Sequence, residues 1–304
     1  MSNIVNEPSS DWGGYWTERK LEAFIKYVKA YLSIMKKQPQ WKLIYFDGFA
    51  GSGERRAKKE EDSLLASFNL FEQIGEDEEN LYQGAAERVI RLSEPDIFDF
   101  YYFVEKYEKN IEKLKNKLFT VAPDKSFKLQ FKPGDCNKWL QELANAMKRK
   151  PNDYASLIFI DPFGMQVDWN SIEQLRGTRS DVWILIPTGV IVNRLLDRKG
   201  ELKFIKKLES FFGLSEFEIR EIFYRKSKVQ SLFDGEEQTT ITKIGDPISR
   251  IADIYIEKMS KVWKFVTKPA LRLDNTRGLP IFHFVFASNN ANAHKIAKQI
   301  IQKV

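Results

Sequence analysis

A glycine-rich turn early in the chain is well suited to hold a ligand. A short apolar run ends in Asp47, and Gly48, Gly51 and Gly53 follow closely. Glycine lets the backbone bend sharply and come close to a bound molecule. After a parallel strand, such a turn lies at the sheet edge where open α/β folds bind ligands. We therefore expect this turn, with Phe49, to line a binding site; a turn that only packs a helix on a strand is the alternative.

The spacing of the glycines separates this turn from two common nucleotide-binding loops. It reads Gly-x-x-Gly-x-Gly, whereas dinucleotide-binding turns read Gly-x-Gly-x-x-Gly, and the Gly-Lys-Ser/Thr of a phosphate-binding loop is missing. With its leading acid, the turn resembles the first motif of class I S-adenosylmethionine-dependent methyltransferases. The resemblance implies S-adenosylmethionine as cofactor.

Two further acids follow the next predicted strands. Glu105 ends one strand, where a carboxylate can accept hydrogen bonds from both ribose hydroxyls of a nucleoside. It lies 52 residues after Gly53, and the usual distance is about 20; a charge-rich insertion at 55–84 would account for the difference. Asp135 and its neighbour Cys136 follow another strand. Asp135 is placed to accept the adenine amino group, or to cap a helix, or both.

An Asp-Pro corner ends a fourth apolar run. It consists of Asp161, Pro162, Phe163 and Gly164. It resembles the Asp/Asn-Pro-Pro-Tyr/Phe corner of amino-methyltransferases, in which the acid and the proline carbonyl accept from an amine and the aromatic ring stacks on a base. Phe163 replaces the second proline and Gly164 replaces the aromatic residue. The sequence therefore leaves both catalysis by this corner and a simple turn open.

The segment after the fifth run would border the same cleft. Thr188, Asn193 and Arg194 are the predicted substrate-binding residues there. Groups of Lys and Arg interleaved with Phe and Tyr follow at 198–207 and 225–228 and could contact phosphates and bases. A solvated helix face is the alternative explanation for such charge runs.

The elements that position these residues alternate between strand and helix. A Rossmann-like α/β fold of the class I methyltransferase type is expected, with a mostly parallel sheet and helices on both faces. A C-terminal antiparallel hairpin is predicted from 264–268 and 281–286. The other predicted strands are 42–46, 100–105, 127–131, 156–160 and 181–186. The organisation we expect is a single domain, 1–304, with an N-terminal helical cap at 12–38, an exposed insertion at 55–84 and a helical insertion at 191–246.

Six motifs together resemble the three-Cys-motif partner proteins, over about residues 12–290. They are WTERKL at 16–21, DGFAGSG at 47–53, FVEK at 103–106, GDCN at 134–137, DPFGMQVDW at 161–169 and PTG at 187–189. The resemblance implies a bacterial or archaeal cytoplasmic protein with a methyltransferase-like fold and a protein partner that carries three cysteines.

The amino-acid composition excludes several classes of protein and site. The chain has 304 residues, a net charge of +6 and 43% hydrophobic residues, the balance of an ordinary globular protein. One cysteine and two histidines exclude a disulfide framework and a zinc site, so no metal is expected. No apolar run reaches the roughly 18 residues of a membrane span, and no signal peptide is evident, so a cytoplasmic location is expected.

Two functions remain after these exclusions. The first is an S-adenosylmethionine-dependent methyltransferase that acts on an amine of a nucleic-acid base. The second is a non-catalytic scaffold of the same fold that binds a nucleotide or a gene-neighbour partner protein.

Overall fold

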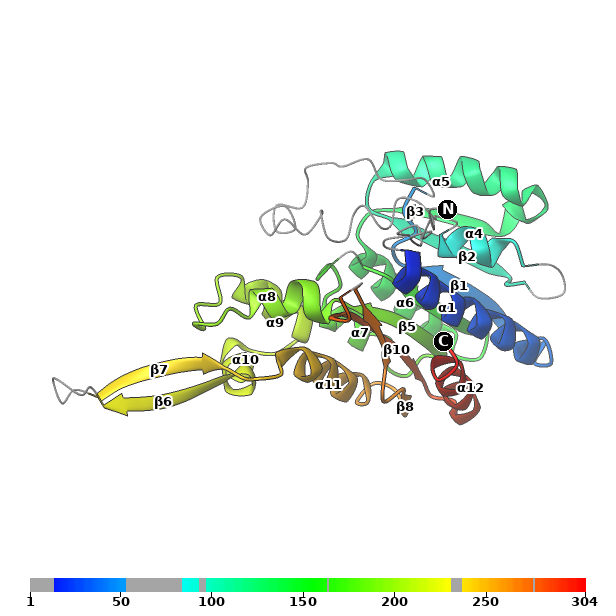
Figure 1. The fold of residues 1–304 in the computed structure, drawn as a ribbon. Helices are drawn as coiled ribbons and strands as arrows, with labels where there is room; N and C mark the ends of the chain where they lie inside the picture. The colour runs from blue at the N-terminus through cyan, green and yellow to red at the C-terminus, as the bar shows by residue number, and fades with distance from the viewer. Residues whose placement is uncertain (1–13, 53–83, 93–96, 163, 231–236, 276) are drawn as a thin grey trace, which may run out of the picture.

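The core of the molecule is a mostly parallel sheet. The computed structural model describes residues 14–52, 84–92, 97–162, 164–230, 237–275 and 277–304 (Figure 1). Its main sheet has 8 strands in the order β3-β2-β1-β4-β5-β10-β8, and β9 also pairs with β10. The first five strands are parallel to one another, and β10 is antiparallel to β5. The strands are β1 (Lys42–Asp47), β2 (Phe100–Glu105), β3 (Leu129–Pro133), β4 (Tyr154–Ile160), β5 (Ser180–Ile186), β8 (Phe265–Val266), β9 (Leu271–Asp274) and β10 (Pro280–Ser288).

The register of the strands brings their carboxyl ends to one edge. Asp47, the last residue of β1, pairs with Phe103 of β2 on one side and Phe159 of β4 on the other. The strand order reverses between β1 and β4, which is the switch point at which open α/β sheets bind ligands. The fold is the Rossmann-like α/β fold predicted from the alternating pattern.

Helices cover both faces of the sheet, because successive strand residues point to opposite faces. Phe24 of α1 stacks on Phe159 with 4.2 Å between ring centroids, whereas Met147 of α6 lies against Ser156, which points the other way. Helices α4, α5 and α12 lie on the α1 side, and α7 and α11 lie on the α6 side. The bounds are α1 (Gly14–Met35), α4 (Ala85–Ile90), α5 (Glu108–Val121), α6 (Cys136–Arg149), α7 (Trp169–Glu173), α11 (Pro247–Met259) and α12 (Ala291–Ile301).

Two predicted strands differ from the structure, one in position and one in length. The third was expected at 127–131, but Phe127 belongs to a 3-10 helix, Pro123–Lys128, and is 76% exposed. Pro123 begins this turn with a preset φ, and the strand starts only at Leu129. The predicted strand 264–268 forms as the shorter β8 and pairs antiparallel with the far end of β10; β9, which was not predicted, also pairs with β10.

The segment 191–246 was predicted to be a helical insertion, and its second half is not helical. A π-helical turn, Thr188–Val192, overlaps its start, and α8 (Asn193–Leu195), α9 (Ile205–Phe212) and α10 (Glu216–Phe223) follow. It then forms an antiparallel hairpin of β6 (Tyr224–Gln230) and β7 (Glu237–Lys243), which projects away from the main sheet in Figure 1. Except for Gly84, the predicted insertion 55–84 lies outside the described residues.

Candidate functional site

Asp47 is a buried acid at the switch point. It is 2% exposed; its Oδ2 accepts from the Tyr45 hydroxyl (3.1 Å) and its Oδ1 accepts from the Phe49 amide (3.2 Å). Burial raises the pKa of Asp47 to about 7, and the negative charge of Asp161 raises it as well. The hydrogen bonds and the Lys20 ammonium oppose this shift without cancelling it. Asp47 therefore changes its charge near neutral pH.

Asp161, the first residue after β4, pairs with a lysine from the N-terminal helix. The Lys20 ammonium lies 2.6 Å from Asp161 Oδ2, and the two side chains are 1% and 11% exposed. The same ammonium lies 5.1 Å from the centre of the Trp16 ring. Asp161 Oδ1 accepts no hydrogen bond from the described residues. The carboxylate is thus held by one oxygen and open at the other.

The glycine turn is fixed to three strands. The Gly48 amide donates to the Phe159 carbonyl (2.9 Å) and the Ala50 amide donates to the Val104 carbonyl (2.9 Å). Gly51 has a φ of +65°, which favours glycine. A Cβ on Gly48 would lie 2.7 Å from Cys136 Sγ, so the thiol is pressed against the turn. Cys136 is buried, and burial raises the pKa of its thiol.

The contact between Gly48 and Cys136 gives a prediction that two substitutions test together. We expect Gly48→Ala to lower the free energy of unfolding by about 1–3 kcal/mol, because the added methyl overlaps Sγ. In a Cys136→Ala background the sulfur is absent, and Gly48→Ala should lower the free energy of unfolding by less than half as much. Urea unfolding of the four proteins of this cycle measures the coupling. Equal costs in both backgrounds would contradict the contact.

Glu105 and Asp135 lie beside the turn. Glu105 is buried, and its Oε1 accepts from the Tyr107 amide and from Asn110 Nδ2, both at 3.2 Å. The Gly134 amide donates to the Glu105 carbonyl (3.0 Å), which brings the start of α6 next to the end of β2. Asp135 is exposed and caps α6 by accepting from the Asn137 amide (2.6 Å). The predicted capping role is confirmed; contact with adenine stays a prediction.

Backbone and side-chain contacts connect α6 to the segment after the Asp-Pro corner. Asn137 Nδ2 donates to the Gln166 carbonyl and its Oδ1 accepts from the Asp168 amide, both at 2.9 Å. A Cβ on Gly164 would lie 3.0 Å from Ile191 Cδ1, so the π-helical turn after β5 packs on the corner. Pro162 is buried within it. Phe163 and Gly53, two predicted site residues, lie outside the described residues.

The three predicted substrate-binding residues have different surroundings. Thr188 is fully buried and its Oγ1 shares a hydrogen bond with His283 Nδ1 (2.8 Å), which holds this segment to β10; contact with a substrate stays a prediction. Asn193 is half-buried, and Lys243 Nζ of β7 donates to its Oδ1 (2.6 Å). Burial lowers the pKa of Lys243 to about 8. Arg194 is exposed.

The structure therefore joins Glu105, Asp135, Cys136, Gly48, Asp47 and Asp161 along one edge, and it adds Lys20. Sequence reasoning missed this lysine because its partner is 141 residues away. Within the described ranges, no group of three or more His, Cys, Asp or Glu side chains is arranged to hold a metal ion. None of the helices in these ranges has the length and apolar character of a membrane span.

Comparison with known proteins gives distant structural likenesses only. The fold is similar to that of protein LPL1258 from Legionella pneumophila (14% identity, TM-score 0.42, covering 91% of this chain and 98% of that one). It is also similar to the methyltransferase domain of bacterial CtHen1 (10%, 0.37, covering 88% and 100%). A third likeness is to Trm1 from Pyrococcus horikoshii, solved with S-adenosyl-L-methionine (9%, 0.35, covering 99% and 76%). No family model and no curated protein matches the chain, so the three-Cys-motif partner family stays a prediction.

Proposed function

We propose that this chain binds S-adenosylmethionine at the carboxyl edge of β1, β2 and β4 and transfers its methyl group to an amine of a nucleic-acid base. The observation that carries the proposal is the alignment of three acids, Asp47, Glu105 and Asp161, at the ends of adjacent strands around a glycine turn. Such an edge offers a cationic nucleoside both carboxylate acceptors and close backbone approach.

The residues present fit this cofactor. Glu105 uses only Oε1 within the described residues, so its second oxygen can accept from the ribose hydroxyls. Asp135 is exposed beside it and can take the adenine amino group. Gly51, with its φ of +65°, lets the backbone of the turn come close to the methionine portion. When bound, S-adenosylmethionine supplies a methyl group on a positively charged sulfur.

The Asp-Pro corner would position the acceptor. Asp161 Oδ1 and the Pro162 carbonyl can each accept a hydrogen from an amine, which orients the nitrogen lone pair toward the methyl group. Lys20 holds the other oxygen of Asp161 and so fixes the carboxylate plane. Lys20 is therefore a positioning residue.

Cofactor binding should strengthen as pH rises through 7. The Asp47 carboxyl is mostly neutral below its pKa of about 7 and mostly charged above it. With Asp161 and Lys20 paired, the ionisation of Asp47 makes the edge negative, which favours a cation. If only the carboxylate form binds, the association constant should rise about tenfold from pH 6 to pH 8. Calorimetric titration with S-adenosylmethionine measures it.

Two variants sharpen this titration. Asp47→Asn removes the titrating charge and should give weak, pH-independent binding. Glu105→Gln should weaken binding at every pH, whereas Glu108→Gln, an exposed acid three residues further on, is the matched control. No binding by the native protein at either pH would overturn the proposed function.

A non-catalytic scaffold is the second candidate, and two observations favour it. Asp161 is already paired with a buried lysine, and Gly164 stands where amino-methyltransferases have an aromatic residue. Incubation with labelled S-adenosylmethionine and DNA, RNA or cell protein separates the two candidates: binding without transfer, with or without a three-cysteine partner protein, would favour the scaffold.

A further inference from the structure

The β6–β7 hairpin is a two-stranded ribbon in which residues 225–227 and 240–242 are exposed on both faces. Its strands pair with each other and with no strand of the main sheet. In Figure 1 it extends beyond α10 and α11, away from the rest of the molecule. Arg225, Lys226, Ser227, Thr240 and Thr242 are all exposed. Apart from Tyr224 at its base, none of the described side chains of the ribbon belongs to the apolar core, so packing alone does not account for it.

The base of the hairpin is anchored beside the candidate site. Lys243 Nζ donates to the carbonyl and side-chain oxygens of Asn193, and the Tyr224 hydroxyl donates to the Asp197 carbonyl (2.8 Å). A Cβ on Gly200 would lie 3.2 Å from Ile241. Asn193 directly follows the π-helical turn after β5, at the carboxyl side of the sheet. The base of the hairpin is thus tied to the segment that follows β5.

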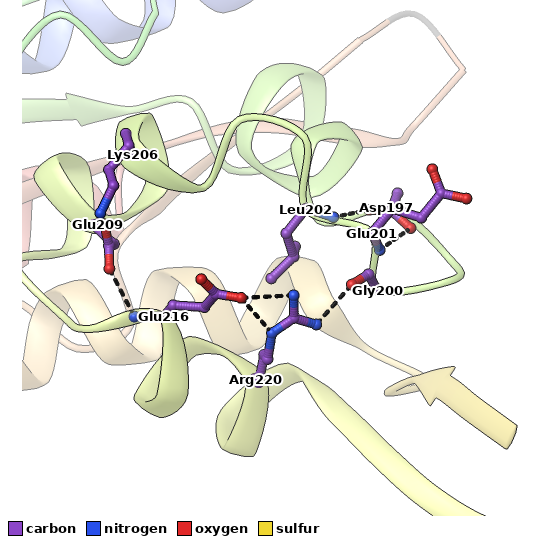
Figure 2. Close-up of polar contacts among 8 residues, drawn as sticks. All are labelled: Asp197, Gly200, Glu201, Leu202, Lys206, Glu209, Glu216 and Arg220. Carbon is purple, nitrogen blue, oxygen red and sulfur yellow. Dashed lines mark hydrogen bonds and ion pairs between the residues drawn. The ribbon is translucent and has the colours of Figure 1, made fainter. Parts of the chain in front are cut away.

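The contacts in Figure 2 hold this base in place. Asp197 accepts from the backbone amides of Glu201 and Leu202, which closes the loop before α9. Arg220 of α10 pairs with Glu216 (2.7 Å) and donates to the Gly200 carbonyl (2.7 Å). Arg220 therefore fixes the loop at Gly200 to α10, and the hairpin begins directly after that helix.

The described exposed side chains of the hairpin are two cations, three hydroxyls and Ile241, which is 37% exposed. Arg225, Ser227, Thr240 and Thr242 share one face, since they pair across the strands, and the Ser227 and Thr240 hydroxyls lie 2.7 Å apart. Lys226 lies on the other face. Arg225 donates only to backbone carbonyls, and no carboxylate of the described residues pairs with either Arg225 or Lys226. Phosphate oxygens are the anionic acceptors that such a surface complements.

The exposed cations extend onto the supporting loop. Arg198 and Lys199 are exposed there, and neither pairs with a carboxylate in the part of the chain that the structure describes. A polyanion that follows the hairpin toward the site would therefore meet positive charge along the way.

We propose that this hairpin binds double-stranded DNA by lying in the major groove, with Arg225 and Lys226 against the phosphates. Each strand has 7 residues, so the ribbon is about 23 Å long at about 3.3 Å per residue. The major groove of B-DNA, about 12 Å wide, admits a two-stranded ribbon, whereas that of double-stranded RNA is too narrow. Single strands are bound by stacking on aromatic rings, and none of the exposed positions named above is aromatic. The proposal extends the proposed function by naming the nucleic acid.

Fluorescence anisotropy of a labelled 20-base-pair DNA duplex tests it. We expect the native protein to bind, and the Arg225→Gln/Lys226→Gln double variant to bind at least several-fold more weakly. The plot of log affinity against log salt concentration should become shallower by about 2, one for each lost phosphate contact. Lys295→Gln/Lys298→Gln, which removes the same charge from two exposed positions of α12, is the matched control and should change neither value.

Several results would contradict the hairpin proposal. Equal losses in both variants, no binding by the native protein, or tighter binding of single strands or duplex RNA would each overturn the hairpin proposal. An unchanged DNA affinity in the hairpin variant would also overturn the hairpin proposal. This holds even if the variant differs in self-association or in binding a partner protein. Titration of the native protein and of the hairpin variant with S-adenosylmethionine tests the proposed function separately. If the native protein binds DNA but not S-adenosylmethionine, the proposed function is overturned and the hairpin proposal stands.

Discussion

Replacing Asp161 by alanine should lower the free energy of unfolding by about 3–5 kcal/mol. The substitution leaves the Lys20 ammonium, which is 1% exposed, without its carboxylate. A buried charge that loses its partner keeps its full desolvation cost. Urea unfolding followed by the fluorescence of the 7 tryptophans measures the loss. This effect also means that loss of methyl transfer in Asp161→Ala alone would not identify a catalytic role.

The control is Lys20→Met in the Asp161→Ala background. Methionine is unbranched and suits a helix, so it can fill the space of the lysine stem beside Trp16. The double variant should recover most of the lost stability, because an apolar pair often replaces a buried ion pair at little cost. It then gives a folded protein in which transfer and cofactor binding can be compared. A single variant as stable as the native protein would contradict the buried pair.

Gly189→Ala should be at least as damaging to the fold. A Cβ at this position would lie 1.9 Å from the Pro280 carbonyl oxygen and 2.9 Å from its carbon, so backbone must move. Since β10 begins at Pro280, the movement would pull the strand away from the turn that follows β5. We expect a loss of about 3 kcal/mol or more in the free energy of unfolding, at the upper end of overpacking effects.

Gly245→Ala is the matched control for this substitution. Gly245 is exposed, and a Cβ there would have nothing within 4 Å, so the change should be within about 0.5 kcal/mol of neutral. Urea unfolding of both variants makes the comparison. If the two substitutions had equal effects, the close approach of Gly189 and Pro280 would be wrong.

The sheet and the acids at its edge could be predicted for one physical reason. Parallel strands buried on both faces have nearly continuous apolar sequences, and their carboxyl ends meet at one edge. Asp47, Glu105 and Asp161 each end or directly follow such a run, so their proximity follows from the order of the strands. The glycine turn was recognisable because few residues other than glycine permit the φ of Gly51.

Lys20 could have been suspected from the helix that carries it. The buried face of α1 includes Trp16, Phe24 and Tyr27, and Lys20 lies on that same face at helical spacing. A lysine inside an aromatic stripe implies a buried partner, but its identity depends on contacts made far along the chain.

The β6–β7 hairpin could not be predicted from periodicity. A strand shows alternating apolar and polar residues only when one face is buried, and the residues from Arg225 to Ser227 and from Thr240 to Thr242 are exposed on both faces. The same lack of burial is why this segment could be mistaken for irregular or helical chain.

The packing of Cys136 against Gly48 has a practical consequence for labelling. The thiolate is the form that reacts with maleimides and iodoacetamides, and burial with a raised pKa keeps the Cys136 thiol protonated and shielded. Because the chain has 1 cysteine, a second one introduced at exposed Thr240 would be the single readily labelled position in the folded protein. A fluorophore placed there would report the surroundings of the hairpin without any need to remove the native cysteine.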